Sequence, residues 1–220
     1  MNKKLSRKIE NKKEVLAWSM YDFANQPFTN LVVTFIYGTF FTTVIASNEI
    51  VGTQQWSHAV SITAIIVALL SPLMGAVADR GGYRKMFMFG FTWLTIIATT
   101  VLYFVLPGEV YRALFWFVIA NVGFEMGSVF CNAYLPDISH SKNIGRISGY
   151  GWSLGYVGGL IALALAMVLL VQAEMPIFGF GKGEVGAYEN IRATNLLAVS
   201  YTHLRAHETE ADLVCRLLLE

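Results

Sequence analysis

Long apolar runs without any charge are the feature that most limits what this chain can fold into. The run Met86–Leu106 has 21 residues and the run Ile147–Val171 has 25, and neither contains Asp, Glu, Lys or Arg. About 20 such residues in a helix are needed to cross the hydrocarbon core of a bilayer. These runs therefore predict membrane-spanning helices.

The composition agrees with lipid as the solvent. The chain is 55% hydrophobic and only 14% charged, whereas globular domains are about 25% charged. It has no basic surface interleaved with aromatic residues, so we expect no nucleic-acid partner. Cys131 and Cys215 do not form a disulfide framework pattern, and no His, Cys or acidic cluster has the spacing of a metal or cofactor site.

Polar and charged segments divide the apolar sequence into successive spans. The predicted fold class is all-α, a polytopic transmembrane helical bundle with five full spans and the start of a sixth. A basic head over residues 1–14 precedes one transmembrane domain over residues 15–199. The expected spans are residues 15–46, 56–78, 86–106, 113–135, 147–171 and, for the start of the sixth, 191–199.

The distribution of Lys and Arg predicts the orientation. Six lie in the head, three in the turn after the second span and two in the loop after the fourth, while the alternate loops hold three in total. Because cytoplasmic loops are enriched in Lys and Arg, the N-terminus is expected in the cytoplasm. A cleaved signal peptide is disfavoured, because the first apolar stretch is too long and lacks a small-residue cleavage site. We expect an integral, multi-pass protein, placed in the inner membrane if the source is bacterial.

Residues 200–220 do not continue the sixth span, because they carry six charges: Arg205, Glu208, Glu210, Asp212, Arg216 and Glu220. Each would cost about 2.5–3.5 kcal/mol at the centre of a span. One interpretation is a cytoplasmic or interfacial amphipathic tail. The other is that the native sequence ends near Val199 or Ser200, because the remainder resembles a translated sequencing adapter.

The basic turn between the second and third spans reads Gly75-Ala-Val-Ala-Asp79-Arg80-Gly-Gly82-Tyr-Arg84-Lys85. A carboxylate at a helix end, beside cations in a tight turn, can form a breakable charge network that biases a two-state equilibrium. The alternative is an ordinary positive-inside loop. We take Gly75, Asp79, Arg80, Gly82, Arg84 and Lys85 as candidate gating residues.

Polar residues inside the spans are candidates for a cavity. Asn121, Glu125, Ser128 and Asn132 recur at helical spacing and predict one polar stripe, and Asp22 and Asn25 share a face of the first span. An ionised carboxylate is costly at mid-bilayer, so Glu125 is expected to line a cavity, with proton coupling as one role and a neutral hydrogen-bonded acid as the alternative. Gly151, Gly155 and Gly159 predict a face for close helix packing.

The pattern Gly-x3-Asp-Arg-x-Gly-x-Arg-Lys resembles the loop between helices 2 and 3 of major facilitator superfamily transporters. Trp18-x2-Tyr21-Asp22-Phe23-Ala24-Asn25 and the segment Asn132-Ala-Tyr-Leu-Pro136-Asp137-Ile138 resemble the UMF1 or vacuole-effluxer (Atg22-like) branch. This resemblance implies two six-helix halves around a central cavity, of which the chain supplies the N-terminal half. The implied partners are the lipid bilayer, a small-molecule solute, protons and the missing C-terminal half.

The predicted function is secondary active transport of a small polar solute by alternating access, with amino-acid efflux implied by the branch resemblance. A membrane enzyme is disfavoured, because His58 and His140 stand alone and form no catalytic cluster. The alternative is a membrane scaffold or regulatory protein that keeps the same fold without transport.

Overall fold

The computed structural model describes residues 12–173 and 177–202, and every regular element in that part is helical. The predicted all-α class is therefore confirmed. Five helical segments are long and apolar enough to cross a membrane: Glu14–Ile45, Glu49–Ala78, Arg84–Tyr103, Val110–Ile138 and Ile144–Val171. A further helix covers residues 189–202.

The first segment is interrupted rather than straight. It consists of α1 (Lys12–Phe28), the π-helix Thr29–Phe35, α2 (Tyr37–Phe40) and the π-helix Phe41–Ile45. Pro27 lies at the end of α1 and has no N–H to donate to the carbonyl of Phe23, four residues earlier. The change from α- to π-type pairing begins two residues after this proline.

The second segment, α3 (Glu49–Gly81), is the longest helix, with 33 residues. At about 1.5 Å per residue it extends for roughly 50 Å. It begins seven residues before the predicted span, because the Asn48 side chain caps it by accepting a hydrogen bond from the Val51 N–H at 2.9 Å. Most of the loop expected over residues 47–55 is thus helical.

The remaining helices follow after short connections. They are α4 (Arg84–Tyr103), α5 (Val110–Asn132), the short α6 (Leu135–Ile138) and α7 (Ile144–Ala166), which continues as a π-helix over Met167–Val171. A 3₁₀ turn over Ile177–Gly179 lies in the connection to the 189–202 helix.

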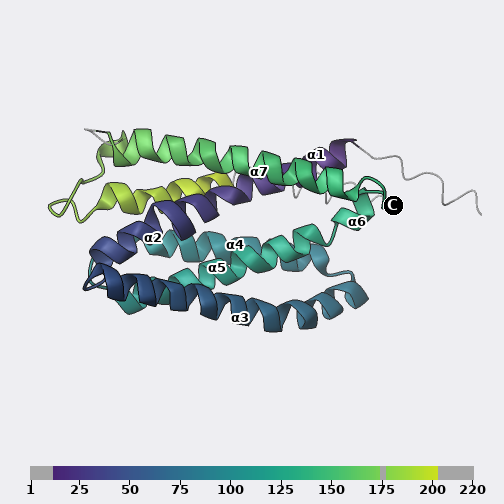
Figure 1. Cartoon of the computed structure of the whole chain (residues 1–220), viewed down its shortest axis with the longest axis horizontal. Helices are drawn as coiled ribbons and strands as arrows, with labels where there is room; N and C mark the ends of the chain where they lie inside the picture. The colour runs from purple at the N-terminus through teal and green to yellow at the C-terminus, as the bar shows by residue number, and fades with distance from the viewer. Residues whose placement is uncertain (1–11, 174–176, 203–220) are drawn as a thin grey trace, which may run out of the picture.

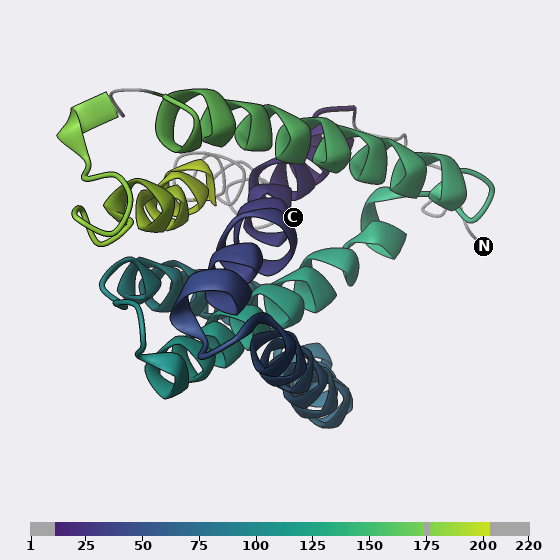
Figure 2. The same ribbon diagram turned by 60° about the vertical axis from the view of Figure 1, so that its left-hand side comes forward.

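The long helices lie side by side along one axis (Figure 1). One end of the bundle holds the α3–α4 turn, α6 and the starts of α1 and α7. We call it the basic end, because Lys12 and Lys13 begin α1, Arg80, Arg84 and Lys85 lie around the α3–α4 turn, and Lys142 and Arg146 lie around the start of α7. The opposite end holds α2 and the α4–α5 connection. Figure 2 shows α7 and the 189–202 helix on one side of α1, and α3, α4 and α5 on the other.

The core is dominated by aromatic and small side chains. Near the opposite end, the rings of Trp56 and Phe117 lie 3.9 Å apart between α3 and α5. Nearer the basic end, Trp18 and Tyr21 of α1 pack with Met126 and Phe130 of α5. The outer face of α3, in contrast, leaves large apolar residues exposed: Ile62, Ile65, Leu69 and Leu73. Such a face requires lipid or another protein surface as its neighbour.

Candidate functional site

The turn between α3 and α4 reverses the chain within two residues. Gly82 adopts a left-handed conformation with φ of 66°, which favours glycine because a Cβ is strained there. The N–H groups of Gly82 and Tyr83 both donate to the Ala78 carbonyl and close the end of α3. α4 then begins at Arg84, so the turn directs this guanidinium toward the end of α5.

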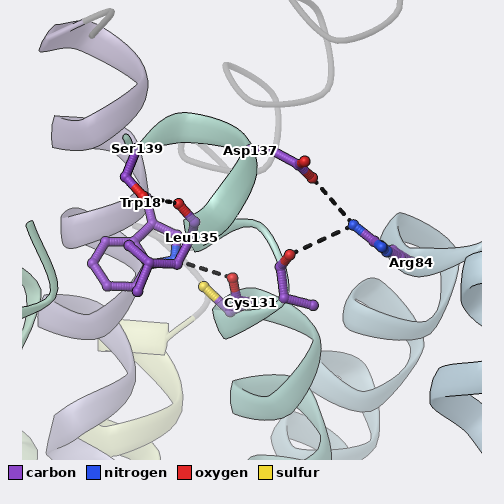
Figure 3. Close-up of polar contacts among 7 residues, drawn as sticks. Trp18, Arg84, Cys131, Leu135, Asp137 and Ser139 are labelled. Carbon is purple, nitrogen blue, oxygen red and sulfur yellow. Dashed lines mark hydrogen bonds and ion pairs between the residues drawn. The ribbon is translucent and has the colours of Figure 1, made fainter. Parts of the chain in front are cut away.

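Arg84 contacts the connection after α5 (Figure 3). Its Nη1 lies 3.1 Å from Asp137 Oδ2 and 3.5 Å from the Ala133 carbonyl oxygen. The side chains are 31% and 48% exposed, respectively. Exposed pairs of this kind contribute only about 0–1 kcal/mol, so the contact can break and re-form at little cost.

A second contact at the basic end is buried. The Trp18 indole Nε1 donates to the Cys131 carbonyl oxygen at 3.0 Å, and it joins α1 to the end of α5 (Figure 3). Trp18 is 1% exposed. The end of α5 is therefore anchored on the α1 side and held by an exposed ion pair on the α4 side.

The other residues of the predicted gating turn are distributed around it. Arg80 is exposed, Lys85 is half-buried, and Gly75 lies on α3 with open space where a Cβ would project. Asp79 belongs to the last turn of α3, and its side chain lies outside the described part. The turn thus brings Arg84 to Asp137, a residue of the Asn132–Ile138 segment that was not among the predicted gating residues.

One feature of the sequence could have indicated Asp137 as a partner of the basic turn. It is the acidic residue directly after Pro136, in a loop expected on the same side as the basic turn. A carboxylate and the cations of the turn on the same side of the membrane indicate a possible ion pair. The sequence could not say which of the three cations of the turn would meet it.

The intramembrane polar residues do not all gather in one place. Asn25 is buried, and its Nδ2 lies 3.2 Å from Ser128 Oγ, which joins α1 to α5. Asn121 is also buried, whereas Glu125 and Asn132 are exposed on α5. The predicted stripe therefore runs from the interior to the surface of the described bundle.

Asp22 lies at the interface between α1 and α7, where the predicted glycine face is located. Gly151, Gly155 and Gly159 are buried on α7 and face α1. A Cβ on Gly151 would lie 2.4 Å from Trp18 Cζ3, and one on Gly155 would touch Asp22. At Gly151 and Gly159, where a Cβ would lie 2.4 Å from Trp18 and from Asn30, only glycine allows so close an approach, whereas a Cβ at Gly155 would make an ordinary contact.

Gly158 belongs to the same face, although the predicted spacing omitted it. A Cβ there would lie 2.3 Å from the carbonyl oxygen of Phe23. This is the carbonyl that Pro27 cannot bond, because proline lacks the N–H. Gly158 of α7 therefore lies against the one carbonyl group of α1 that Pro27 leaves without its helical hydrogen bond.

A polar network closes the opposite end of the bundle. The Tyr103 hydroxyl donates to Glu189 Oε1 at 2.6 Å, and the Gly181 N–H donates to Glu189 Oε2 at 3.1 Å. These hydrogen bonds, that of Tyr103 first, hold the pKa of the Glu189 carboxyl below its usual range. Arg192 is 8% exposed and donates to the Tyr103 and Ala187 carbonyl oxygens at 2.6 and 3.0 Å.

This network ties the end of α4 to the start of the 189–202 helix. The Arg192 guanidinium also lies 5.4 Å from the centre of the Tyr103 ring. Arg192 is the second residue of the segment predicted as the start of the sixth span. Its aromatic and carbonyl partners lie up to 89 residues away, so spacing along the chain gave no indication of them.

Within residues 12–173 and 177–202, no group of three His, Cys, Asp or Glu side chains is arranged to hold a metal ion. Cys131 is buried in the α1–α5 core. The residues His203, His207 and Cys215 lie outside the described part, as does nearly all of the 200–220 segment.

Comparison with known proteins shows similarity to Atg22-like proteins and to an MFS-type transporter. The sequence profile described as "Vacuole effluxer Atg22 like" matches residues 56–145, which include the basic turn and Asp137. An uncharacterized MFS-type transporter, YxiO of Bacillus subtilis, is 31% identical over 168 residues, 74% of this chain and 39% of the relative. These matches confirm the resemblance to the Atg22-like branch that the sequence showed.

Other relatives extend the Atg22-like relationship. An uncharacterized protein of Aquifex aeolicus is 31% identical over 160 residues, 73% of this chain and 40% of that protein. Autophagy-related protein 22 of Coccidioides immitis is 34% identical over 79 residues, 36% of this chain and 13% of that protein. The Atg22-like chain spans about two fifths of the length of its bacterial relatives. No solved structure gives a significant match.

Together, the helices and the relatives make the Atg22-like chain an integral, multi-pass membrane protein. Five segments have the length and hydropathy to cross a bilayer. The exposed apolar face of α3 needs such an environment. The candidate site is a set of charged and polar contacts at the ends of the spans, together with carboxylates inside them.

Proposed function

We propose that the Atg22-like chain forms the N-terminal half of a secondary transporter that moves a small polar solute by alternating access. The ion pair between Arg84 and Asp137 carries this proposal, because it joins two helix ends through an exposed contact of 3.1 Å. A contact that costs little to break suits a protein that alternates between two conformations. The remaining length of the transporter would supply a second half, which faces Asp79 and Arg80.

The helix packing supports a division into moving and fixed parts. α1 and α7 meet through buried glycines and would move as one rigid unit. The Arg84–Asp137 contact lies outside that unit. Breaking it would free the α3–α4 turn relative to α6 and shift the population between the two conformations.

The solute and the coupling are the finer part of the proposal. Amino-acid efflux is the activity that fits the vacuole-effluxer relationship. Glu125 is exposed on α5 within a membrane-spanning segment, so in the full protein it would face either a cavity or the second half. A carboxyl group in that position is suited to taking up and releasing a proton. The N-terminus would lie in the cytoplasm, because seven of the ten Lys and Arg residues in the described part of the chain lie toward the basic end.

The test uses the full-length transporter, with the gene completed beyond this chain, in proteoliposomes loaded with labelled amino acids. A proton gradient should drive labelled solute across the membrane, and Glu125→Gln should abolish the response to the gradient. Glu184→Gln is the matched control, because Glu184 is exposed in the connection after α7. Unchanged gradient-driven transport in Glu125→Gln would rule out proton coupling at this residue.

A folded full-length protein that moves none of the tested solutes would overturn the transport proposal. Folding is verified by helical circular dichroism and a monodisperse chromatographic profile. That outcome would favour the non-transporting scaffold.

A further inference from the structure

Several buried polar groups in the half of the bundle nearer the opposite end have no hydrogen-bond partner in the described part of the chain. They include the hydroxyls of Tyr37 and Thr99 and both amide atoms of Asn195, and these side chains are 0%, 1% and 0% exposed, respectively. Gln55 and Asn190 each add one oxygen. Buried polar side chains are almost always bonded to protein or to ordered water, so a group of exceptions in one region indicates a common ligand.

Thr99 and Asn195 lie at the same level of the bundle. Arg192 Nη1 donates to the Tyr103 carbonyl oxygen at 2.6 Å, which joins the end of α4 to the start of the 189–202 helix. These two helices run in opposite directions from that contact (Figure 1). Thr99 lies four positions before the contact in α4, and Asn195 lies three positions after it in the other helix. Both are therefore about one turn from the contact, toward the middle of the bundle.

Asn195 faces the first membrane-spanning segment. The rings of Tyr188 and Phe40 lie 5.6 Å apart, and the Thr202 hydroxyl donates to the Ala24 carbonyl oxygen at 3.5 Å. Asn195 is seven positions from each of these two contacts, midway between them. Residues seven positions apart share a helix face, so the amide of Asn195 is directed at the first segment between its two contact points.

Thr99 faces the same segment from α4. The hydroxyl of Thr92, seven positions earlier, lies 3.2 Å from the hydroxyl of Tyr21 in α1, so Thr99 is on the face of α4 that meets the first segment. Tyr37 belongs to that segment and interacts electrostatically with Arg192. Its ring lies in the same buried cluster as Leu102 and Ala198, from α4 and the 189–202 helix. Three elements thus present unpaired polar groups to one junction.

The chemistry of the unpaired atoms selects the ligand. Asn195 leaves both a donor, Nδ2, and an acceptor, Oδ1, without a partner in the described part, so a bare anion or a bare cation would satisfy only half of the amide. The Arg192 guanidinium, one turn away, also repels a cation. The hydroxyls of Thr99 and Tyr37 can donate or accept. The ligand is therefore neutral, both donates and accepts, and is small, because these side chains are almost completely enclosed.

We propose that a cluster of water molecules is bound where the first segment, α4 and the 189–202 helix meet, with hydrogen bonds to Asn195, Thr99 and Tyr37. An internal water typically makes about three hydrogen bonds to otherwise unpaired polar groups. Water at this junction would let the 189–202 helix shift against the first segment without leaving buried polar groups unpaired. The function proposed above does not require this site.

The test is hydroxyl-radical footprinting of the 220-residue chain in lipid nanodiscs, with radicals generated by X-ray radiolysis of water and modified residues identified by mass spectrometry. Radicals formed from a bound water modify the side chain beside it, even where bulk solvent does not reach. Tyr37 should be modified several-fold faster than Tyr21. Tyr21 is the matched control, because it is also buried, at 2% exposed, but its hydroxyl lies 3.2 Å from Thr92 Oγ1.

Two variants remove polar groups of the site at similar side-chain size. Thr99→Val and Asn195→Leu should each lower the modification rate of Tyr37 several-fold, toward that of Tyr21. Thr95→Val should leave the rate unchanged, because Thr95 is buried on the same helix but its hydroxyl already donates to the Phe91 and Ala120 carbonyl oxygens.

Equal modification rates of Tyr37 and Tyr21 in the wild-type chain would overturn the proposal, because they would mean that no water lies beside Tyr37. Equal effects of Thr99→Val and Thr95→Val would overturn it as well, because the Thr99 hydroxyl would then play no specific part. If Asn195→Leu fails to fold, the comparison of the two threonine variants decides the outcome.

Discussion

The α1–α7 interface and the Arg84–Asp137 contact hold the bundle together in opposite ways. At the interface, four glycines bring two backbones together, so that a Cβ on Gly158 would lie 2.3 Å from the Phe23 carbonyl oxygen. At the contact, two exposed side chains meet at 3.1 Å. The first cannot loosen without separating the helices, whereas the second can break while every helix stays intact.

This difference indicates how a helical bundle of this kind could move without unfolding. Helices that pack tightly would move as one rigid unit, and exposed ion pairs would break where two such units separate. The polar network at Tyr103, Glu189 and Arg192 belongs with the first type, because Arg192 is 8% exposed and has two carbonyl partners. Changes to these sites should therefore differ in their effect on stability.

The largest loss of stability is expected for Gly158→Ala. The added methyl group would force α1 and α7 apart and cost about 3 kcal/mol. Unfolding of the purified chain in mixed micelles, followed by circular dichroism, measures this. Gly149→Ala is the control on the same helix, because no atom lies within 4 Å of a Cβ at that position. Equal stability of the two variants would show that the interface is not tightly packed.

Arg192→Leu should have the next largest effect. It removes the donors to the Tyr103 and Ala187 carbonyl oxygens, and we expect a loss of about 2 kcal/mol because two polar groups lose their partner. The same unfolding assay applies, with Arg112→Leu as a control at an exposed cation of the same end. A loss of stability no greater than that of the control would show that the network does not stabilise the fold as the tightly packed α1–α7 interface does.

A smaller effect should appear as pH dependence. The pKa of the Glu189 carboxyl is lowered in the folded state by the Tyr103 hydroxyl and the Gly181 N–H. Its contribution to stability is therefore present above the pKa of the unfolded chain and is lost as the pH falls through the folded pKa. Between about pH 7 and about pH 3, the unfolding midpoint of the wild type should fall more than that of Glu189→Gln. Parallel curves would contradict this.

The sequence predicted the helical class and the family because both depend on local features. An uncharged run such as Met86–Leu106 has few alternatives to a membrane helix, and the Gly75–Lys85 pattern is contiguous. The Gly151, Gly155 and Gly159 spacing indicated a packing face, but only the structure shows α1 as the helix packed against it. The start of α3 was placed too late, because the polar residues before Trp56 resemble a loop.

Contacts between distant residues could not be predicted in the same way. Arg84 and Asp137 are 53 positions apart, and three cations in the turn were equivalent candidates for any acidic partner. The surroundings of Glu125 also depend on neighbouring helices, so its exposed position on α5 had no local signal. Periodicity places a residue on a helix face but does not say what that face meets.

The smallest effect on stability is expected at the Arg84–Asp137 contact, and it provides the sharpest functional test. Breaking an exposed pair should change the unfolding free energy by less than about 1 kcal/mol. Transport should respond more strongly, because the pair biases two conformations of similar energy.

The decisive measurement is solute transport by the full-length protein in proteoliposomes for Arg84→Asp, Asp137→Arg and the variant with both changes. Each single change places like charges together and should reduce transport several-fold, while the double change restores the attraction and most of the rate. Wild-type rates in both single variants, or a double variant no better than either, would contradict a gating role for this contact.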